Sequence, residues 1–221
     1  TKTVNRRELG YLLEEETAAC SKTLRRNLYD LLQRNLPQIV PDYLSWEYIE
    51  KGYAEVGRLY FDGHFVPYYG KKDIGSGFFT QRRLAMPGHE QYWANDLRGR
   101  PVFFLNSYGF SRFTQVIPEL CEKALAYMRQ SGNTKPLLVA FDRGGYCRLL
   151  FRELSGMGVC WVTWKAGETQ YRPEEDFKET FSIGTGRERC EYGIIYIKVR
   201  MSGDKEPVDA AIILNKKTKK Q

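Results

Sequence analysis

The run Leu137-Leu138-Val139-Ala140-Phe141, followed at once by Asp142, decides the fold that we expect for this chain. A continuous apolar run is typical of a strand buried on both faces of a helix-covered sheet. Helical periodicity precedes it from Thr114 to Gln130, and a short helix from Tyr146 to Leu154 follows it. A second apolar run, Val159 to Trp164, predicts a neighbouring strand. This alternation indicates an α/β domain with a mixed sheet.

Upstream of this unit the pattern changes to strands. The mostly apolar segment Val56 to Phe61 predicts a strand that ends on Asp62, and Phe65 to Tyr69 is its expected hairpin partner. Further short strands are expected at Arg82 to Met86, Gln91 to Asn95 and, after a turn at 97–100, Pro101 to Leu105.

Three regions follow from these patterns. We expect an N-terminal helical segment over residues 1–55, a core over residues 56–165 and a strand-rich insertion over residues 166–221. The insertion contains the apolar segments Ile194 to Val199 and Ala210 to Leu214, and we expect it to be incomplete.

Bulk composition narrows the class of partner. The 221 residues carry a formal net charge of +7 and a pI of about 9.1, which favours a polyanionic partner. No apolar run approaches the ~20 residues needed to span a bilayer, so no membrane partner is expected. The five cysteines are scattered without a close pair, which indicates a reducing compartment. Only two histidines occur, which argues against a multi-histidine metal site.

Two aspartates are the candidate metal ligands. Asp62 and Asp142 each close an apolar strand, and functional groups gather where the strands of an α/β sheet end. Two adjacent carboxylates repel each other unless a cation neutralises them, and Mg²⁺ or Mn²⁺ prefers such oxygen ligands. The alternative is that each residue only caps a turn, Asp142 before Arg-Gly-Gly and Asp62 in a hairpin.

Two motifs around these aspartates resemble a known family. The segments Phe61-Asp62-Gly63-His64-Phe65-Val66-Pro67-Tyr68-Tyr69-Gly70-Lys71-Lys72 and Phe141-Asp142-Arg143-Gly144-Gly145-Tyr146 resemble the first and second aspartate motifs of bacterial DDE-type insertion-sequence transposases. The segment 96–101 and Trp164-Lys165 are also similar to that family. The resemblance implies a ribonuclease-H-like mixed sheet flanked by helices, with Asp62 and Asp142 as catalytic metal ligands.

The family also implies a third acidic ligand, a Glu on a helix after the last core strand. No segment with the family's surroundings occurs here, and the downstream acids are better interpreted as solvated charges: Glu168, Glu174, Glu175, Glu188 and Glu191. We therefore expect a truncated, decayed or otherwise impaired transposase, with weakened metal binding and turnover.

Several cationic residues near the motifs are candidate DNA contacts. Lys71, Lys72, Arg82 and Arg83 flank the first motif, and Arg143 follows Asp142. A solvated loop explains the first four equally well, and an ion pair is the commoner role for Arg143. His64, on the same strand face as Asp62, could contact the substrate or hydrogen-bond a ligand carboxylate, and a structural hydrogen bond is the alternative. Trp93, Trp161 and Trp164 could stack on a flipped base, although core packing is the stronger expectation for the last two.

The sequence thus predicts a DNA transposase that cleaves and joins strands at transposon ends with Mg²⁺ or Mn²⁺. A ribonuclease-H-like nuclease and a non-catalytic DNA-binding remnant of a transposase are the alternatives. The expected partner is double-stranded DNA, as transposon ends and as target. Because such transposases assemble as dimers on paired ends, the resemblance also implies a homodimer, although no dimer face is recognisable. The expected location is the bacterial cytoplasm, at the nucleoid.

Overall fold

The computed structural model describes residues 21–34, 36–80, 82–107, 112–167, 171–185, 189–201 and 207–221. The chain forms two compact units, Thr1–Trp164 and Lys165–Gln221. Each unit is described below by itself.

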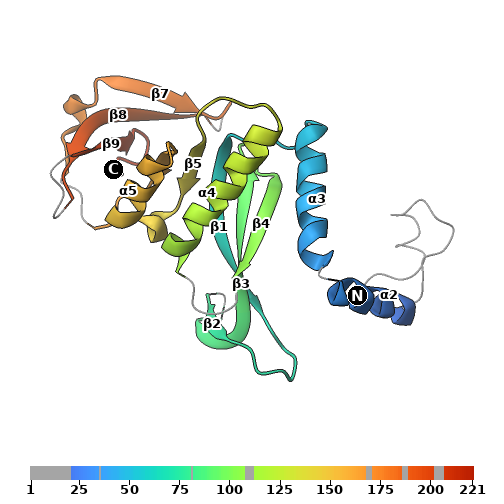
Figure 1. Cartoon of the computed structure of the whole chain (residues 1–221). Helices are drawn as coiled ribbons and strands as arrows, with labels where there is room; N and C mark the ends of the chain where they lie inside the picture. Colours follow the sequence, from blue (N-terminus) through green and yellow to red (C-terminus); the bar gives the residue numbers. More distant parts are fainter. Residues whose placement is uncertain are drawn as a thin grey trace. The chain divides into compact units, whose positions relative to one another are not determined.

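In the first unit, two described helices precede the sheet, and two further helices lie between its later strands in the chain (Figure 1). Its elements are α2 (Ser21–Gln33), α3 (Leu36–Glu50), β1 (Arg58–Pro67), β2 (Ser76–Phe79), β3 (Leu84–Asp96), β4 (Pro101–Ser107), α4 (Phe113–Gln130), β5 (Leu138–Phe141), the 3-10 turn η1 (Arg143–Gly145), α5 (Arg148–Gly156) and β6 (Cys160–Thr163).

The sheet of the first unit is mixed. Its main strands lie in the order β4-β3-β1-β5-β6, and β2 is paired to β3. Strands β4, β3 and β1 are antiparallel neighbours, whereas β1, β5 and β6 run parallel to one another. The expected α/β class with a mixed sheet is therefore confirmed.

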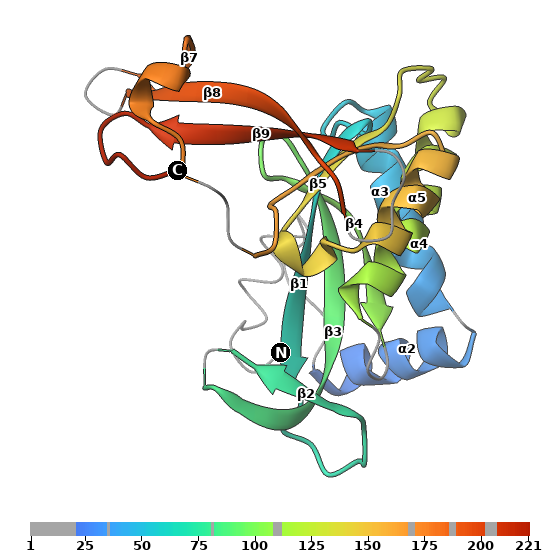
Figure 2. The same cartoon turned by 90° about the vertical axis from the view of Figure 1, so that its left-hand side faces the viewer.

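One face of this sheet forms the core. Figure 2 shows α4 and α5 on the same side of the sheet. Alternate strand residues point to that side and are almost completely buried, as are the apolar residues of the two helices that cover them: Leu59, Phe61, Ala94, Val139, Phe141, Ile117, Leu120, Ala124, Leu150 and Leu154. Because strand side chains alternate, the residues between them point to the opposite face. We call that opposite face the open face.

Strand β1 is longer than the sequence predicted. It continues through Asp62 to Pro67 and pairs along its whole second half with β3, from Asp62↔Trp93 to Pro67↔Gly88. The expected hairpin between two short strands is therefore wrong, and Asp62 lies in the middle of a strand. At Gly63 a Cβ would lie 3.2 Å from the ring of Tyr92, so the backbone and this ring are in close contact.

Two other elements also differ from expectation. The two short strands expected between Arg82 and Asn95 form one long strand, β3, which pairs with β1, β2 and β4. The helix expected from Tyr146 begins only at Arg148, because the turn η1 occupies Arg143–Gly145. The turn at 97–100 is confirmed, and Gly99 has the positive φ of 74° that such a turn requires.

The N-terminal helical segment is helical where it is described, in α2 and α3. Residues 1–20, which belong to that expected segment, lie outside the described residues. Helix α3 is tied to α4 by an ion pair between Asp42 and Lys123 and by the Tyr127 hydroxyl, which donates to the Asp42 carbonyl at 3.3 Å. No helix in the described ranges is both long and apolar enough to cross a membrane.

The second unit is a small antiparallel sheet. It consists of the 3-10 turn η2 (Glu174–Asp176) and the strands β7 (Glu179–Ile183), β8 (Cys190–Val199) and β9 (Val208–Asn215), with β8 in the centre. Phe177 packs with Ile212 and Leu214 in its core. Strands were expected in this region, and the strand-rich character is confirmed.

Candidate functional site

Asp62 and Asp142 lie side by side on neighbouring parallel strands. The last paired residues of β1 and β5 are Phe61 and Phe141, and both aspartates follow one residue later. Both phenylalanines are buried on the helix side, and the backbone of Asp142 is extended, so both carboxylates point to the open face. Neighbouring strands are about 4.8 Å apart, a spacing at which two carboxylates can share one cation.

The hydrogen bonds of the two carboxylates use one oxygen of each. Oδ1 of Asp62 accepts from the Gly63 amide at 2.9 Å, and Oδ1 of Asp142 accepts from the Gly144 amide at 2.8 Å. The capping role considered for Asp142 is therefore present. It leaves Oδ2 of each residue without a hydrogen-bond donor in the described part of the chain, so capping and cation binding are compatible.

The turn after β5 holds Asp142 in place. Gly144 allows the close approach of the carboxylate, because a Cβ would lie 2.9 Å from Oδ1. The Thr163 hydroxyl of β6 donates to the Asp142 carbonyl at 2.8 Å. The Gly144 amide thus holds the carboxylate of Asp142, and Thr163 holds its backbone.

The phenol of Tyr60 lies close enough to Asp62 and Asp142 for their charges to change its pKa. Tyr60 precedes Asp62 by two residues and therefore shares its strand face. The pKa of the Tyr60 phenol is raised by partial burial and, next, by the negative charges of Asp62 and Asp142. One hydroxyl thus experiences the charge of both carboxylates, which agrees with their neighbouring register.

The two carboxylates belong to a longer row on the open face. Asp62 is paired with Trp93 of β3, and Trp93 is paired with Phe104 of β4. The rings of Trp93 and Phe104 are 4.7 Å apart. On the other side, Thr163 is the partner of Phe141, so Trp164 is the residue that follows next to Asp142. Sequence reasoning did not recognise Phe104, whose place follows only from strand pairing.

His64 lies one position further along the open face. It is exposed and two residues beyond Asp62, about 7 Å along the strand. Its strand partner is Gln91, which donates a hydrogen bond to Asn106 of β4 at 3.2 Å. No hydrogen bond joins His64 to Asp62 within the described ranges.

The basic candidates lie on an extension of the sheet. We call residues 63–91 the hairpin arm; all of them except residue 81 are described. The arm extends away from α4 and α5 at the lower end of the molecule in Figure 1. Its exposed cations lie at the two ends of β2: Lys71 and Lys72 before it, Arg82 and Arg83 after it.

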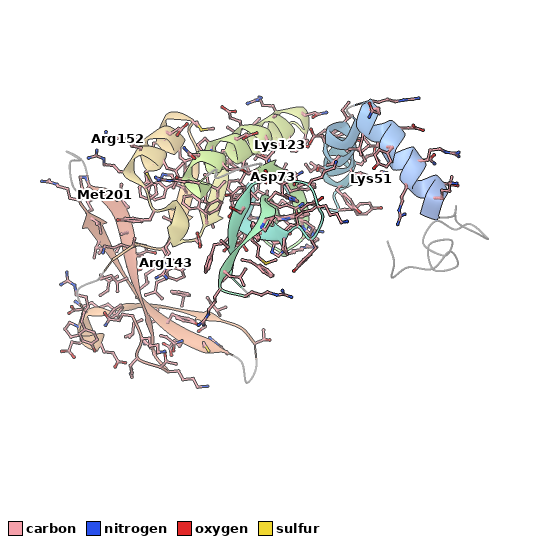
Figure 3. All side chains as sticks on the ribbon, turned by 90° about the horizontal axis from the view of Figure 1, so that it is seen from below. Lys51, Asp73, Lys123, Arg143, Arg152 and Met201 are labelled. Atoms are coloured by element: carbon pink, nitrogen blue, oxygen red, sulfur yellow. The ribbon has the colours of Figure 1, made fainter. Side chains whose placement is uncertain are left out.

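Arg143 is exposed beside the carboxylates. Figure 3 shows it on the side of the first unit away from Lys123 and Arg152, which lie on α4 and α5. No ion pair of Arg143 occurs within the described residues, although pairing was the commoner expectation for an arginine so placed. Its guanidinium is available to an anion near Asp142.

Two of the downstream acids are engaged in ion pairs within the second unit. Glu174 is paired with Lys219 at 2.5 Å and Glu191 with Lys216 at 3.0 Å, so both hold the end of the second unit together. Glu175 is exposed in η2, and Glu168 and Glu188 lie outside the described residues. Among the described residues, no group of three His, Cys, Asp or Glu side chains could hold a metal ion.

A third aspartate of the core sheet, Asp96, has a structural role. Its side chain is 1% exposed and accepts hydrogen bonds from the amides of Arg98 and Arg100, while the Arg100 side chain forms an ion pair with it at 2.5 Å. Burial acts to raise the pKa of Asp96, but these hydrogen bonds together lower it. The segment 96–101, which resembles the family, therefore forms a turn that Asp96 stabilises.

The donor set at Asp62 and Asp142 fits a hard divalent ion. It offers only carboxylate oxygens, it is exposed, and one oxygen of each residue has no protein donor among the described residues. Mg²⁺ and Mn²⁺ bind through one or two carboxylates and complete their shells with water and substrate oxygens.

Comparison with known proteins gives the family. A family model described as "Transposase protein" matches residues 2–189. The chain belongs to this transposase family. A search of curated proteins finds no match.

Two solved transposase structures are similar to this one. The Mos1 mariner paired end complex with Mn is 11% identical, with a TM-score of 0.33, over 73% of this transposase and 59% of that chain. The piggyBac transposase synaptic complex with hairpin DNA is 12% identical, with a TM-score of 0.36, over 89% of this transposase and 41% of that chain. The chain therefore spans 59% and 41% of the lengths of these two proteins.

Proposed function

We propose that this chain is a DNA transposase of the DDE type that cleaves DNA at transposon ends and joins the freed strand to a target. The observation that carries the proposal is the neighbouring position of Asp62 and Asp142 on the open face, within a chain of the transposase family. We further propose that residues 56–165 form its catalytic core.

The proposed ligands of the cation are the carboxylates of Asp62 and Asp142, with Mg²⁺ or Mn²⁺ bound. When bound, such ions activate a water molecule or a 3′-hydroxyl and stabilise the leaving oxygen of a phosphodiester. The protein's own contribution is to hold the two carboxylates in one direction. Gly144 and Thr163 do this for Asp142, and the pairing of β1 with β3 does it for Asp62.

The proposed DNA contacts lie around the carboxylates. Arg143 would bind a phosphate next to Asp142, and His64 would contact the substrate from the neighbouring position of β1. Lys71, Lys72, Arg82 and Arg83 would track the DNA backbone along the hairpin arm. A homodimer on paired ends and a location at the nucleoid are part of the same proposal.

A strand-joining assay tests this function. The substrate is a labelled duplex made from the DNA that flanks the coding sequence, and the target is a supercoiled plasmid in Mn²⁺ buffer. A transposase joins the labelled strand to the plasmid. Degradation of both DNAs without joining would contradict the proposal and indicate a ribonuclease-H-like nuclease.

One observation favours a second candidate function. The described residues supply no third acidic ligand near Asp62 and Asp142, and a site with two ligands binds a cation weakly. A non-catalytic DNA-binding remnant of a transposase would bind the same duplex without cutting it. Retained binding with neither cleavage nor joining in Mn²⁺ would favour this candidate.

A further inference from the structure

Exposed apolar side chains of the first unit occur both on the open face and on helix α3. On the open face, Trp164 is 70% exposed, so the core packing expected for it is wrong, whereas Trp161 stacks on Phe151 at 3.9 Å as expected. That surface belongs to the site already described. Helix α3 packs against β4, at the edge of the sheet opposite β6 (Figure 1). Its exposed apolar residues therefore have no part in that site.

Helix α3 is apolar on two opposite sides. Ser45 and Ile49 are buried on the side that packs against the rest of the unit. Large apolar residues with exposed fractions between 44% and 60% lie on the other side: Ile39, Val40, Tyr43, Leu44 and Tyr48. We call these five residues the α3 outer face. A helix that is apolar all round is normally covered all round, so the α3 outer face indicates a bound partner.

The charges of α3 argue against DNA as that partner. The charged residues within Leu36–Glu50 are all acidic: Asp42, Glu47 and Glu50. Lys51, which follows the helix, is paired with Glu47 at 2.6 Å and adds no free positive charge. DNA phosphates bind where Lys and Arg neutralise them, and α3 repels them. The α3 outer face therefore suits an apolar protein surface.

The spacing of the five residues suits a second copy of the same helix. Residues four apart lie in one row along a helix, so positions 39, 43 and 47 form one row and positions 40, 44 and 48 form the next. An antiparallel copy, related by a two-fold axis between positions 43 and 44, sets one row against the other. Tyr43 then lies against the partner's Leu44, and Tyr48 against the partner's Ile39. Each aromatic ring meets an aliphatic side chain, and the symmetric contact closes on itself.

The area of the α3 outer face is large enough for such a pair. A half-exposed side chain of this size presents roughly 80–100 Å² to solvent. The five side chains and the polar atoms beside them thus supply about 500 Å² per copy, or about 1,000 Å² for two copies. This total is about the smallest that a specific protein interface buries, so we expect a dissociation constant in the micromolar range.

We propose that the α3 outer face is the contact surface between two copies of this chain, paired antiparallel about a two-fold axis between Tyr43 and Leu44. The proposal rests on the proposed function, in which two copies hold paired transposon ends. Because α3 lies at the edge of the sheet opposite β6, the contact between copies and the binding of the cation use separate residues.

Sedimentation velocity of the whole chain without DNA measures the pairing. The wild type should change from monomer to dimer as its concentration rises through the micromolar range. Leu44→Glu should raise the Kd of the dimer by about a hundredfold, because each dimer would bury two unpaired charges at its centre. The melting temperature should not change, since Leu44 is 49% exposed. Leu149→Glu in α5 is the matched control, because Leu149 is 67% exposed on another helix, and it should leave the Kd unchanged.

A mixture of two variants tests the antiparallel register. Tyr43→Lys should be monomeric by itself, as Leu44→Glu should be. An equimolar mixture of the two should form a heterodimer. In that mixed pair the new ammonium group and the new carboxylate lie opposite each other, while the second contact between Tyr43 and Leu44 is that of the wild type. A mixture that stays monomeric would contradict the two-fold arrangement.

The outcomes separate this inference from the proposed function. A wild type that remains monomeric up to its solubility limit would overturn the pairing, and so would equal Kd values for wild type and Leu44→Glu. A fall in melting temperature in both Leu44→Glu and Tyr43→Lys would show that another part of the chain covers α3, which would also overturn it. A dimer that behaves as expected but never joins DNA strands would contradict the proposed function alone.

Discussion

Aspartate side chains at the two ends of the pairing between β1 and β5 differ in burial and in hydrogen bonding. At one end, Asp96 is buried, and backbone amides and Arg100 satisfy its carboxylate. At the other end of the pairing between β1 and β5, Asp62 and Asp142 are exposed, and each has an oxygen without a protein donor among the described residues. A satisfied buried acid contributes to stability, whereas two unsatisfied neighbouring acids repel each other. The comparison indicates that Asp96 is there for folding and the other two for binding.

The largest expected effect is the loss of activity when either exposed aspartate, Asp62 or Asp142, is replaced. Asp62→Asn and Asp142→Asn should each reduce DNA cleavage in Mn²⁺ on the order of a thousandfold, because a bound cation supplies several kcal/mol of transition-state stabilisation. The melting temperature should not fall, since each change removes a charge from a repelling pair. Loss of cleavage together with a drop in melting temperature would break the comparison, because it would make these residues structural.

The next largest effect is the loss of stability when the buried aspartate, Asp96, is replaced. Asp96→Asn should lower the free energy of unfolding by about 2 kcal/mol, because an amide cannot accept all the hydrogen bonds and leaves Arg100 unpaired. Urea unfolding followed by circular dichroism measures this change. The half-exposed Arg100 keeps the effect moderate. An unchanged urea midpoint would contradict the structural role.

The stability lost in Asp96→Asn should depend on pH. The pKa of Asp96 is lowered in the folded state, so its contribution to stability is present above the unfolded-state pKa of about 3.9. That contribution is lost as the pH falls through the lower folded-state pKa. The stability difference between wild type and Asp96→Asn should therefore be full at pH 7 and shrink below about pH 4. A constant difference would exclude the ionised form as the cause.

A smaller effect concerns the hairpin arm. Replacing Lys71 and Lys72 by Ala should make the dependence of log K on log salt for duplex binding shallower by about 1.8, if each lysine neutralises one phosphate. The control is Lys51→Ala with Arg58→Ala, which removes the same charge from residues paired with Glu47 and Glu55. Equal slopes in both double variants would show that only net charge matters.

The smallest effect concerns the turn that fixes Asp142. Gly144→Ala should weaken Mn²⁺ binding a few-fold, because the new methyl group would lie 2.9 Å from the carboxylate Oδ1 and displace it. Gly156→Ala in α5 is the matched control, since a Cβ there meets nothing within 4 Å. Calorimetry with Mn²⁺ should separate the two. Identical affinities would mean that the turn does not position Asp142.

Sequence patterns predicted the parts of this picture that depend on burial. The apolar runs before Asp142 and Trp164 gave β5 and β6, and the helical period gave α4. The second half of β1 was mispredicted, because Asp62 and His64 on the open face and Gly63 under Tyr92 interrupt the apolar pattern. That strand exists because β3 pairs with it, which no local signal shows. The exposure of Trp164 was missed for the converse reason: an apolar residue next to a buried strand is usually core.

Mn²⁺ binding, followed by electron paramagnetic resonance, tests the central claim most directly. The claim is that Asp62 and Asp142 share one divalent cation. Wild type and Asp96→Asn should bind Mn²⁺ with the same affinity, and Asp62→Asn and Asp142→Asn should each lose that binding. Equal affinity in wild type and Asp142→Asn would contradict the claim.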